Sequence, residues 1–282
     1  MRPRQWTKNG FVFAGVLFDG KLFQPDYLIS ALAGFVVFCF LSSAVYLIND
    51  VVDAPADRLH PTKRNRPIAR GDVAAPVAVA LAAVLALGSL TAAFALHPGF
   101  GLIGLLYFGS TMLYTLSLKH IVIVDVLVLA LGFVLRVGGG AVLAEAIRFS
   151  PWMYLCMMLL ALLLGFGKRR QELVELGGSS STRAILSEYS IPLLDQIISV
   201  VTAVTLAAYS FYTFSAPALP ADHTMMLTIP FVVYGIFRYL YLVHVKGAGG
   251  APDELLITDR PLQIGIALWT ITAVIVLYVL PQ

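Results

Sequence analysis

Apolar residues occur in nine runs separated by short polar segments. The runs cover residues 11–18, 28–48, 75–96, 100–117, 121–144, 152–167, 193–214, 224–245 and 261–280. A helix needs roughly 20 apolar residues to cross the hydrocarbon of a bilayer, and all runs but the first approach that length. We expect residues 1–10 to extend the short first run as an amphipathic helix at the membrane interface. The pattern predicts an all-α, polytopic membrane protein built as a bundle of nine helices.

The composition agrees with this pattern. Of the 282 residues, 59% are hydrophobic and 12% are charged, which is about half the charge of a typical soluble domain. Nine helices use about 180 residues, so residues 1–282 are expected to form a single transmembrane domain. Cys39 and Cys156 lie in apolar runs without a nearby partner, which predicts buried thiols rather than a disulfide or a metal site. The net charge of +3 gives no reason to expect a nucleic-acid partner.

The charged residues predict an orientation in the membrane. When successive loops are assigned to alternate sides, 15 of the 19 Lys and Arg residues fall on one side. Lys21 and Arg148 fall on the other side, and Arg136 and Arg238 lie within helices. The positive-inside rule makes the basic side cytoplasmic, with the N-terminus inside and the C-terminus outside. Twelve of the 16 carboxylates share that side, which the rule does not explain and which predicts a polar site open to the cytoplasm.

The end of the second run carries a stripe of oxygen ligands. At 100° per residue, one face of a helix presents Tyr46, Asn49, Asp50, Asp53 and Asp57. Pro55 is expected to bend or end the helix, which makes the position of Asp57 the least secure. Converging carboxylates repel one another unless a cation lies between them, and an all-oxygen set suits Mg²⁺ carrying substrate phosphates. A solvated helix end is the alternative, but aligned acids in a membrane helix are costly unless they are used.

Basic residues follow this stripe in the chain. Arg58, His60, Lys63, Arg64 and Arg66 lie within nine residues and supply the positive charge that phosphates require. Further along, Arg136 lies about 15 residues into the fifth run, where an unpaired guanidinium is costly. We therefore expect Arg136 to have an anionic partner, either a carboxylate or a substrate phosphate. The glycines at 138–140 favour close helix packing or a break at a cavity over a phosphate loop, since the flanking P-loop residues are missing.

The spacing Asn49-Asp50-x-x-Asp53-x-x-x-Asp57 resembles the first aspartate motif of the UbiA superfamily of intramembrane prenyltransferases. Segments 2–9, 60–67, 118–120, 167–173 and 259–263 are similar to one branch of that superfamily, and the resemblance extends over about residues 1–280. Members of that branch move phosphoribose from phosphoribosyl pyrophosphate to a lipid phosphate such as decaprenyl phosphate, for cell-wall arabinan synthesis. The resemblance implies a helical bundle in the plasma membrane, a homo-oligomer (a trimer) and an active site facing the cytoplasm.

The residues and the resemblance together predict a set of roles. Asn49, Asp50, Asp53 and Asp57 would hold Mg²⁺ on the pyrophosphate leaving group, the three aspartates forming the catalytic set. Phosphate oxygens would be bound by Lys8, Tyr46, His60, Lys63, Arg64, Arg66 and Lys119, with Arg136 as a further candidate. Lys168, Arg169 and Arg260 would place either the acceptor phosphate or the ribose 5-phosphate, and the sequence does not decide which.

The chain departs from the wider superfamily at one motif. Typical prenyltransferases of this superfamily carry a second aspartate motif at the end of the sixth helix, whereas this chain has Lys168-Arg169-Arg170 and Glu172 there. A cationic patch suits a bound phosphate directly, although surface ion pairs at helical spacing are the alternative. Two other functions remain open: transfer of a prenyl group from a polyprenyl diphosphate to an aromatic or other acceptor, and transport of a phosphorylated solute. A transporter usually shows inverted repeats, and the sequence has no convincing internal repeat.

Overall fold

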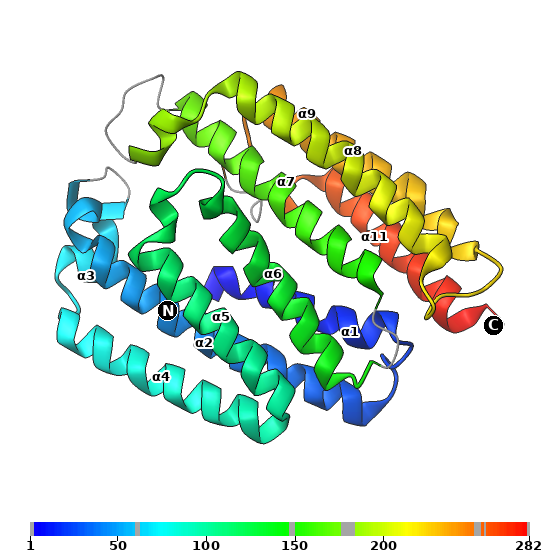
Figure 1. Ribbon diagram of the computed structural model, residues 1–282, viewed down its shortest axis with the longest axis horizontal. Helices are drawn as coiled ribbons and strands as arrows, with labels where there is room; N and C mark the ends of the chain where they lie inside the picture. The colour runs from blue at the N-terminus through cyan, green and yellow to red at the C-terminus, as the bar shows by residue number, and fades with distance from the viewer. Residues whose placement is uncertain are drawn as a thin grey trace.

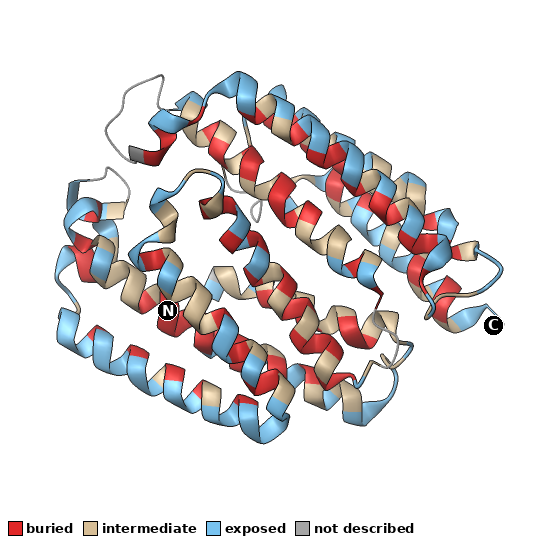
Figure 2. Cartoon of the chain, viewed as in Figure 1, coloured by how far each residue is buried: buried red, intermediate tan, exposed pale blue. Residues whose placement is uncertain are grey.

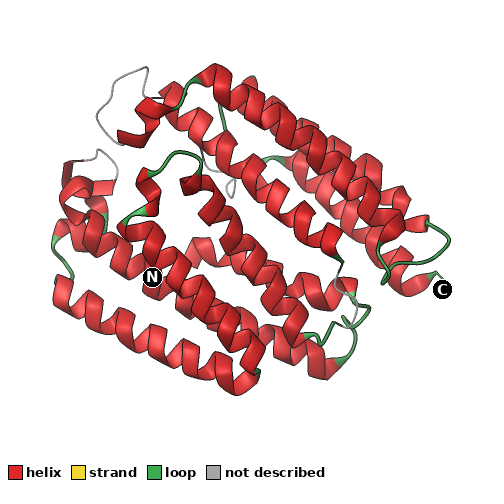
Figure 3. Cartoon of the chain, in the orientation of Figure 1, coloured by secondary structure: helices red, strands yellow, loops and turns green. Residues whose placement is uncertain are grey.

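Helices make up the whole regular structure of the described residues. The computed structural model describes residues 3–59, 63–146, 150–175, 184–250, 255–256 and 258–280, and these contain no strand (Figure 3). Eight helices of the described residues are long and apolar enough to cross a membrane. They are α2 (Pro25–Leu59), α4 (Ala75–Leu96), α5 (Pro98–Leu116), α6 (Val124–Leu143), α7 (Pro151–Glu175), α8 (Ile191–Ser215), α9 (Ile229–His244) with the preceding turn η5 (Thr224–Thr228), and α11 (Arg260–Val274) with the π-helical turn η6 (Ile275–Val279). The prediction of an all-α, polytopic membrane protein is confirmed.

Local sequence explains where these helices begin. Proline lies in the first turn of α4, α5, α8, α9 and α11, where its missing N–H has no partner to lose. Three helices also carry a side-chain cap: the His97 ring accepts a hydrogen bond from the Gly99 N–H at 3.0 Å, Ser190 accepts one from the Leu193 N–H at 3.3 Å, and Asp259 accepts one from the Leu262 N–H at 2.9 Å. Apolar runs and helix-start residues therefore agree along most of the chain.

The helices pass back and forth between two ends of the molecule. Successive helices pack against each other from α4 to α8, α2 packs against α4, and α9 packs against α11 (Figure 1). One end holds the last turns of α2, α5, α7 and α9 and the first turns of α4, α6, α8 and α11; we call it the charged end. Of the predicted site residues that the structure describes, those on α2 from Asn49 onward, in the connections after α2 and α5, at the end of α7 and at the start of α11 belong to it, whereas Asp19, Lys21 and Glu145 belong to the opposite end.

Burial is greatest in α6 and α2, whereas α4 and α5 show wide exposed faces (Figure 2). The exposed side chains of α4 include Val77, Val84 and Leu87. In a membrane-spanning chain such faces contact lipid, because lipid is as apolar as these side chains.

The first apolar run does not lie at the interface, so that prediction was wrong. Its 3-10 turn η1 (Pro3–Val12) and short helix α1 (Phe13–Phe18) pack against α2 and α6, and Asn9, Val12 and Val16 are fully buried. A Cβ on Gly140 would lie 1.9 Å from the carbonyl oxygen of Val12. The glycines of α6 therefore allow backbone-to-backbone contact, as the sequence predicted, and that contact holds the N-terminal segment inside the bundle.

Candidate functional site

The acidic stripe of α2 forms one continuous helical face. Helix α2 runs through Pro55 to Leu59, so of the two outcomes expected at this proline, a bend or an end of the helix, the end was wrong. A single guanidinium nitrogen of Arg66 contacts Asp50 Oδ1 at 3.1 Å and Asp57 Oδ2 at 2.5 Å. Residues 50 and 57 are two turns apart, so their shared partner shows that the proline does not rotate Asp57 away from the stripe.

The middle of the stripe is held by a second cation. Lys119 Nζ donates to Asp53 Oδ1 at 2.7 Å, and Asn49 Nδ2 donates to Asp53 Oδ2 at 2.9 Å. Lys119 belongs to η3 (Leu118–His120), the connection between α5 and α6. Arg66, by contrast, precedes the short helix α3 (Pro67–Arg70) after α2. Two loops distant in sequence thus bring their cations to three carboxylates on one helix.

This oxygen set fits a magnesium ion chemically. Asn49, Asp50, Asp53 and Asp57 offer one amide and three carboxylates, and oxygen ligands of this kind are those that Mg²⁺ prefers. Among the described residues, no group of three or more His, Cys, Asp or Glu side chains is close enough to hold a metal. The aspartates instead form ion pairs with Arg66 and Lys119. Binding of Mg²⁺ would therefore require these cations to give up carboxylate oxygens.

The remaining basic residues near α2 divide into two groups. Lys63 and Arg64 form the turn η2 (Lys63–Asn65) beside the stripe, and Arg64 is exposed. Arg58 instead donates to the Ala69 carbonyl oxygen at 3.1 Å, which ties the end of α2 to α3. His60 lies outside the described residues.

Two further predicted phosphate-binding residues, Lys8 and Tyr46, lie in η1 and α2. Lys8 Nζ donates to Gln5 Oε1 at 2.5 Å within η1. Tyr46 is half-buried one turn before Asn49 on α2. The phosphate roles assigned to Lys8 and Tyr46 from the sequence remain predictions.

Arg136 is buried among neutral groups. Its guanidinium donates to Asn9 Oδ1 at 2.7 Å, to the Gly132 carbonyl oxygen at 2.8 Å and to the Tyr107 hydroxyl at 2.8 Å. The rings of Tyr107 and Phe133 also lie within 4.6 and 5.6 Å of the guanidinium carbon. No carboxylate pairs with Arg136 among the described residues, so the carboxylate alternative is not found there. Neutral oxygens and aromatic faces stabilise the charge instead.

Arg169 forms a buried ion-pair network at the start of α6 and the end of α7. Its Nε donates to Asp125 Oδ2 at 2.6 Å and its NH1 to Glu172 Oε2 at 2.6 Å. The second oxygen of Asp125 accepts the Tyr189 hydroxyl at 2.8 Å. Arg169 and Asp125 are 3% and 0% exposed, so this guanidinium fixes α6 to α7 and does not reach solvent. Sequence reasoning missed Tyr189, because nothing local to it indicates a partner 64 residues away.

The other predicted cations lie on α7 and α11. Lys168 is half-buried on α7, and Arg260 is exposed at the first position of α11. Arg238, which the sequence placed within a helix, makes a two-point contact with Asp259 at 3.1 and 2.7 Å. That contact lowers the pKa of Asp259 below the ordinary aspartate value of 3.8.

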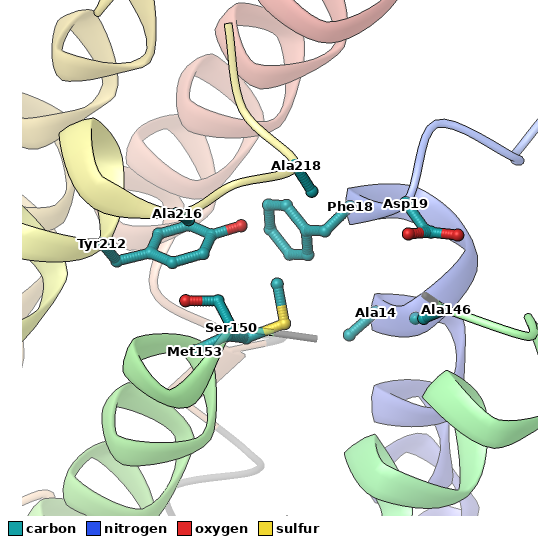
Figure 4. A pocket seen from close by; sticks show the side chains of 10 residues that line it. Ala14, Phe18, Asp19, Ala146, Ser150, Met153, Tyr212, Ala216 and Ala218 are labelled. Carbon is teal, nitrogen blue, oxygen red and sulfur yellow. The ribbon is translucent and has the colours of Figure 1, made fainter. Parts of the chain in front are cut away.

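A small pocket lies at the opposite end of the bundle. It is lined by side chains of α1, of the start of α7 and of the end of α8, including Phe18, Asp19, Met153 and Tyr212 (Figure 4). Ser150 also lines it, and its buried hydroxyl oxygen has no hydrogen-bond partner. None of the predicted site residues lines this pocket, so it is separate from the acidic stripe.

Comparison with known proteins gives one consistent result. The pattern of the UbiA prenyltransferase family matches residues 10–251. A decaprenyl-phosphate phosphoribosyltransferase of Corynebacterium glutamicum is 33% identical over 100% of this chain and 86% of its own length, and one of Mycobacterium tuberculosis is 35% identical over 96% and 91%. Among solved structures, a UbiA homolog from Archaeoglobus fulgidus bound to DMAPP and Mg²⁺ has a TM-score of 0.75, with 19% identity and coverage of 99% and 98%. At that identity the structural likeness establishes the fold alone.

Proposed function

The chain belongs to the UbiA prenyltransferase family and is a membrane-bound transferase, and from that premise we propose that it transfers 5-phosphoribose from phosphoribosyl pyrophosphate to a polyprenyl phosphate such as decaprenyl phosphate. The product would be a polyprenylphosphoryl-5-phosphoribose for cell-wall arabinan synthesis. One observation carries the choice of reaction: relatives named decaprenyl-phosphate phosphoribosyltransferase are 33–35% identical over 95–100% of this chain. The acidic stripe and its cations provide the matching chemistry.

The stripe is assigned to the pyrophosphate group of the donor. Asn49, Asp50, Asp53 and Asp57 would hold Mg²⁺, which when bound neutralises charge on the leaving group. Arg66 and Lys119 already lie against these carboxylates, so the same side chains are placed to bind phosphate oxygens once their carboxylates face a metal. Lys8, Tyr46, His60, Lys63 and Arg64 are proposed to bind further oxygens of the donor.

The second phosphate is assigned to the end of α7. Lys168 is its proposed ligand, with Arg260 as a further candidate. The guanidinium of Arg169 is already bonded to Asp125 and Glu172, so it would support this patch by holding α7 in place. Arg136 is a further candidate for a phosphate oxygen, which would replace one of its present partners, Asn9, Gly132 or Tyr107. The lipid tail of the acceptor would lie along apolar helix faces that open to the bilayer.

The proposed reaction balances without an added base. A nonbridging oxygen of the lipid phosphate forms a bond to C1 of the ribose, and the bond from C1 to the pyrophosphate oxygen breaks. The leaving pyrophosphate takes the electron pair, so its developing charge is what the site must stabilise. The lipid phosphate is already ionised at neutral pH, and attack on the face opposite the leaving group gives inversion at C1, as in other direct glycosyl transfers.

A second candidate function is transfer of a prenyl group from a prenyl diphosphate. Two solved structures with the same fold are described as bound to DMAPP or GPP with Mg²⁺. In this chain, however, α7 ends in Lys168-Arg169-Arg170, where the resemblance to typical prenyltransferases calls for aspartates. We therefore rank this function second.

An assay of each donor in a separate reaction distinguishes the two functions. Purified protein in detergent or nanodiscs is incubated with Mg²⁺ and either decaprenyl phosphate with ribose-labelled phosphoribosyl pyrophosphate, or an aromatic acceptor with a labelled prenyl diphosphate. We expect labelled lipid from the first donor, with release of pyrophosphate, and no product when Mg²⁺ is removed with EDTA. A product formed only from the prenyl diphosphate, with an aromatic acceptor, would overturn the proposal.

Asp53→Asn tests whether the stripe is the donor site. The change keeps the shape of the side chain but removes the charge that holds Lys119 and, in the proposal, Mg²⁺, so we expect a loss of turnover of at least about 100-fold. Asp72→Asn is the matched control, because Asp72 is an exposed aspartate of the same end whose partner is Arg70. Equal activity of both variants would remove Asp53 from the site.

A further inference from the structure

The connection between α5 and α6 contains a residue in a conformation that its side chain disfavours. Ile123 has φ 69° and ψ −44°, and the Val124 N–H donates to the Val122 carbonyl oxygen at 2.8 Å. This is a classic γ-turn, which is rare and strained. A positive φ is particularly unfavourable for a β-branched residue such as isoleucine. Something in the fold must therefore hold this turn.

The hydroxyl of Tyr189 makes the contact that holds it. The Ile123 N–H donates to this hydroxyl at 2.7 Å, and the hydroxyl donates to Asp125 Oδ1 at 2.8 Å. Tyr189 is 5% exposed, and Asp125 is itself fixed by Arg169 at 2.6 Å. Burial raises the pKa of Tyr189 to about 12, so the hydroxyl keeps its proton at neutral pH.

The held turn lies next to a residue of the proposed donor site. Only a short connection, residues 117–123, links the end of α5 to the start of α6. Lys119 lies in this connection, four residues before Ile123, and reaches across to Asp53 at 2.7 Å. Relaxation of Ile123 to a negative φ would change the direction of the chain at this point. A change at the γ-turn would therefore act on the same short connection that carries Lys119.

We infer that Tyr189 is a positioning residue for the donor site: its hydroxyl holds the γ-turn at Ile123 and thereby places Lys119 against Asp53. Tyr189 follows the turn η4 (Ala184–Glu188), between α7 and α8. The inference therefore links the α7–α8 connection to the binding of the diphosphate donor. It rests on the proposed function only for the identity of that donor.

The test combines one change that removes the Tyr189 hydroxyl with a second change that lets residue 123 adopt the turn without it. Tyr189→Phe keeps the buried ring, and Ile123→Gly supplies a residue that adopts φ 69° without strain. For Tyr189→Phe we expect faster hydrogen exchange in residues 117–124 and a KM for the donor raised about tenfold, the equivalent of one charge-assisted hydrogen bond. The KM for the lipid acceptor should change less than twofold. Adding Ile123→Gly to Tyr189→Phe should return the donor KM to within about threefold of wild type.

Tyr239→Phe is the matched control, since Tyr239 is also a buried tyrosine, 5% exposed, in the same apolar cluster; its donor KM should match that of the wild type. Unchanged exchange or an unchanged donor KM in Tyr189→Phe overturns the inference. So does a defect that affects both substrates equally, or one that Ile123→Gly leaves in place. Exchange is measured without substrate, and the KM is measured for whichever diphosphate the wild type uses. Failure of the proposed donor therefore remains distinguishable from failure of the inference.

Discussion

Gly140→Ala inserts one methyl group at the narrowest contact between the N-terminal segment and α6. An ideal Cβ would lie 1.9 Å from the Val12 carbonyl oxygen, and contacts below 3.0 Å essentially never occur. The blocking atom belongs to the backbone, so no side-chain rotation relieves the clash. The segment and the helix must therefore separate by at least about 1.1 Å.

The expected cost follows from two terms. Overpacking of this kind costs about 1–3 kcal/mol. The separation also stretches the bond from Arg136 Nε to Asn9 Oδ1, now 2.7 Å, beyond hydrogen-bonding distance, and a bond to a charged group contributes about 1.5–3 kcal/mol. Helix propensity acts in the opposite direction, because alanine is favoured over glycine by up to about 1 kcal/mol. We expect a net loss of about 3 kcal/mol.

The assay compares this variant with Gly138→Ala on the same helix. A Cβ on Gly138 would meet the nearest side-chain atom, Ile103 Cδ1, at 3.9 Å, an ordinary contact. Thermal unfolding in detergent should show a clearly lower Tm for Gly140→Ala and an equal or slightly higher Tm for Gly138→Ala. Equal Tm values for the two variants would refute the reasoning, because they would mean that η1 does not pack against α6 as described.

Three other predictions follow. Asp259→Asn keeps a capping side chain but loses the charge that pairs with Arg238. Pairing lowers the pKa of Asp259 in the folded protein. The stabilisation that the ion pair contributes is therefore present above the unfolded pKa of Asp259 and is lost as the pH falls through the folded pKa. The Tm difference from wild type should thus be seen at pH 7 and become smaller as the pH falls below 3.8, the ordinary aspartate value; a difference independent of pH would contradict this. Lys168→Ala should raise the KM of one phosphate substrate about tenfold. Unchanged KM and kcat for both substrates would favour the alternative that Lys168 only forms a surface ion pair. For the orientation, a membrane-impermeant thiol reagent added to intact cells should label Asp222→Cys and not Asp72→Cys, both residues being exposed; the reverse pattern would invert the predicted topology.

The fold was largely predictable because its signals are local. Apolar runs of span length and prolines in first turns depend only on neighbouring residues, so eight spans were placed close to where the structure has them. The stripe from Asn49 to Asp57 also followed from helical period alone, and Arg66 shows that Asp50 and Asp57 share a face. Local rules failed at Pro55, where the bundle keeps α2 helical despite the missing hydrogen bond.

The partners of the charged residues could not be read in the same way. The sequence indicated that cations and carboxylates gather at one end, but not that Lys119 meets Asp53 or that Arg169 is buried against Asp125. The sequence also predicted that η1 lies at the membrane interface, because its pattern is amphipathic. In the structure, the glycine contacts and the hydrogen bond between Arg136 and Asn9 hold η1 inside the bundle. Hydropathy and period report on one helix at a time. Contacts between residues 44, 66 or 127 positions apart depend on how the helices pack, and only the tertiary structure decides them.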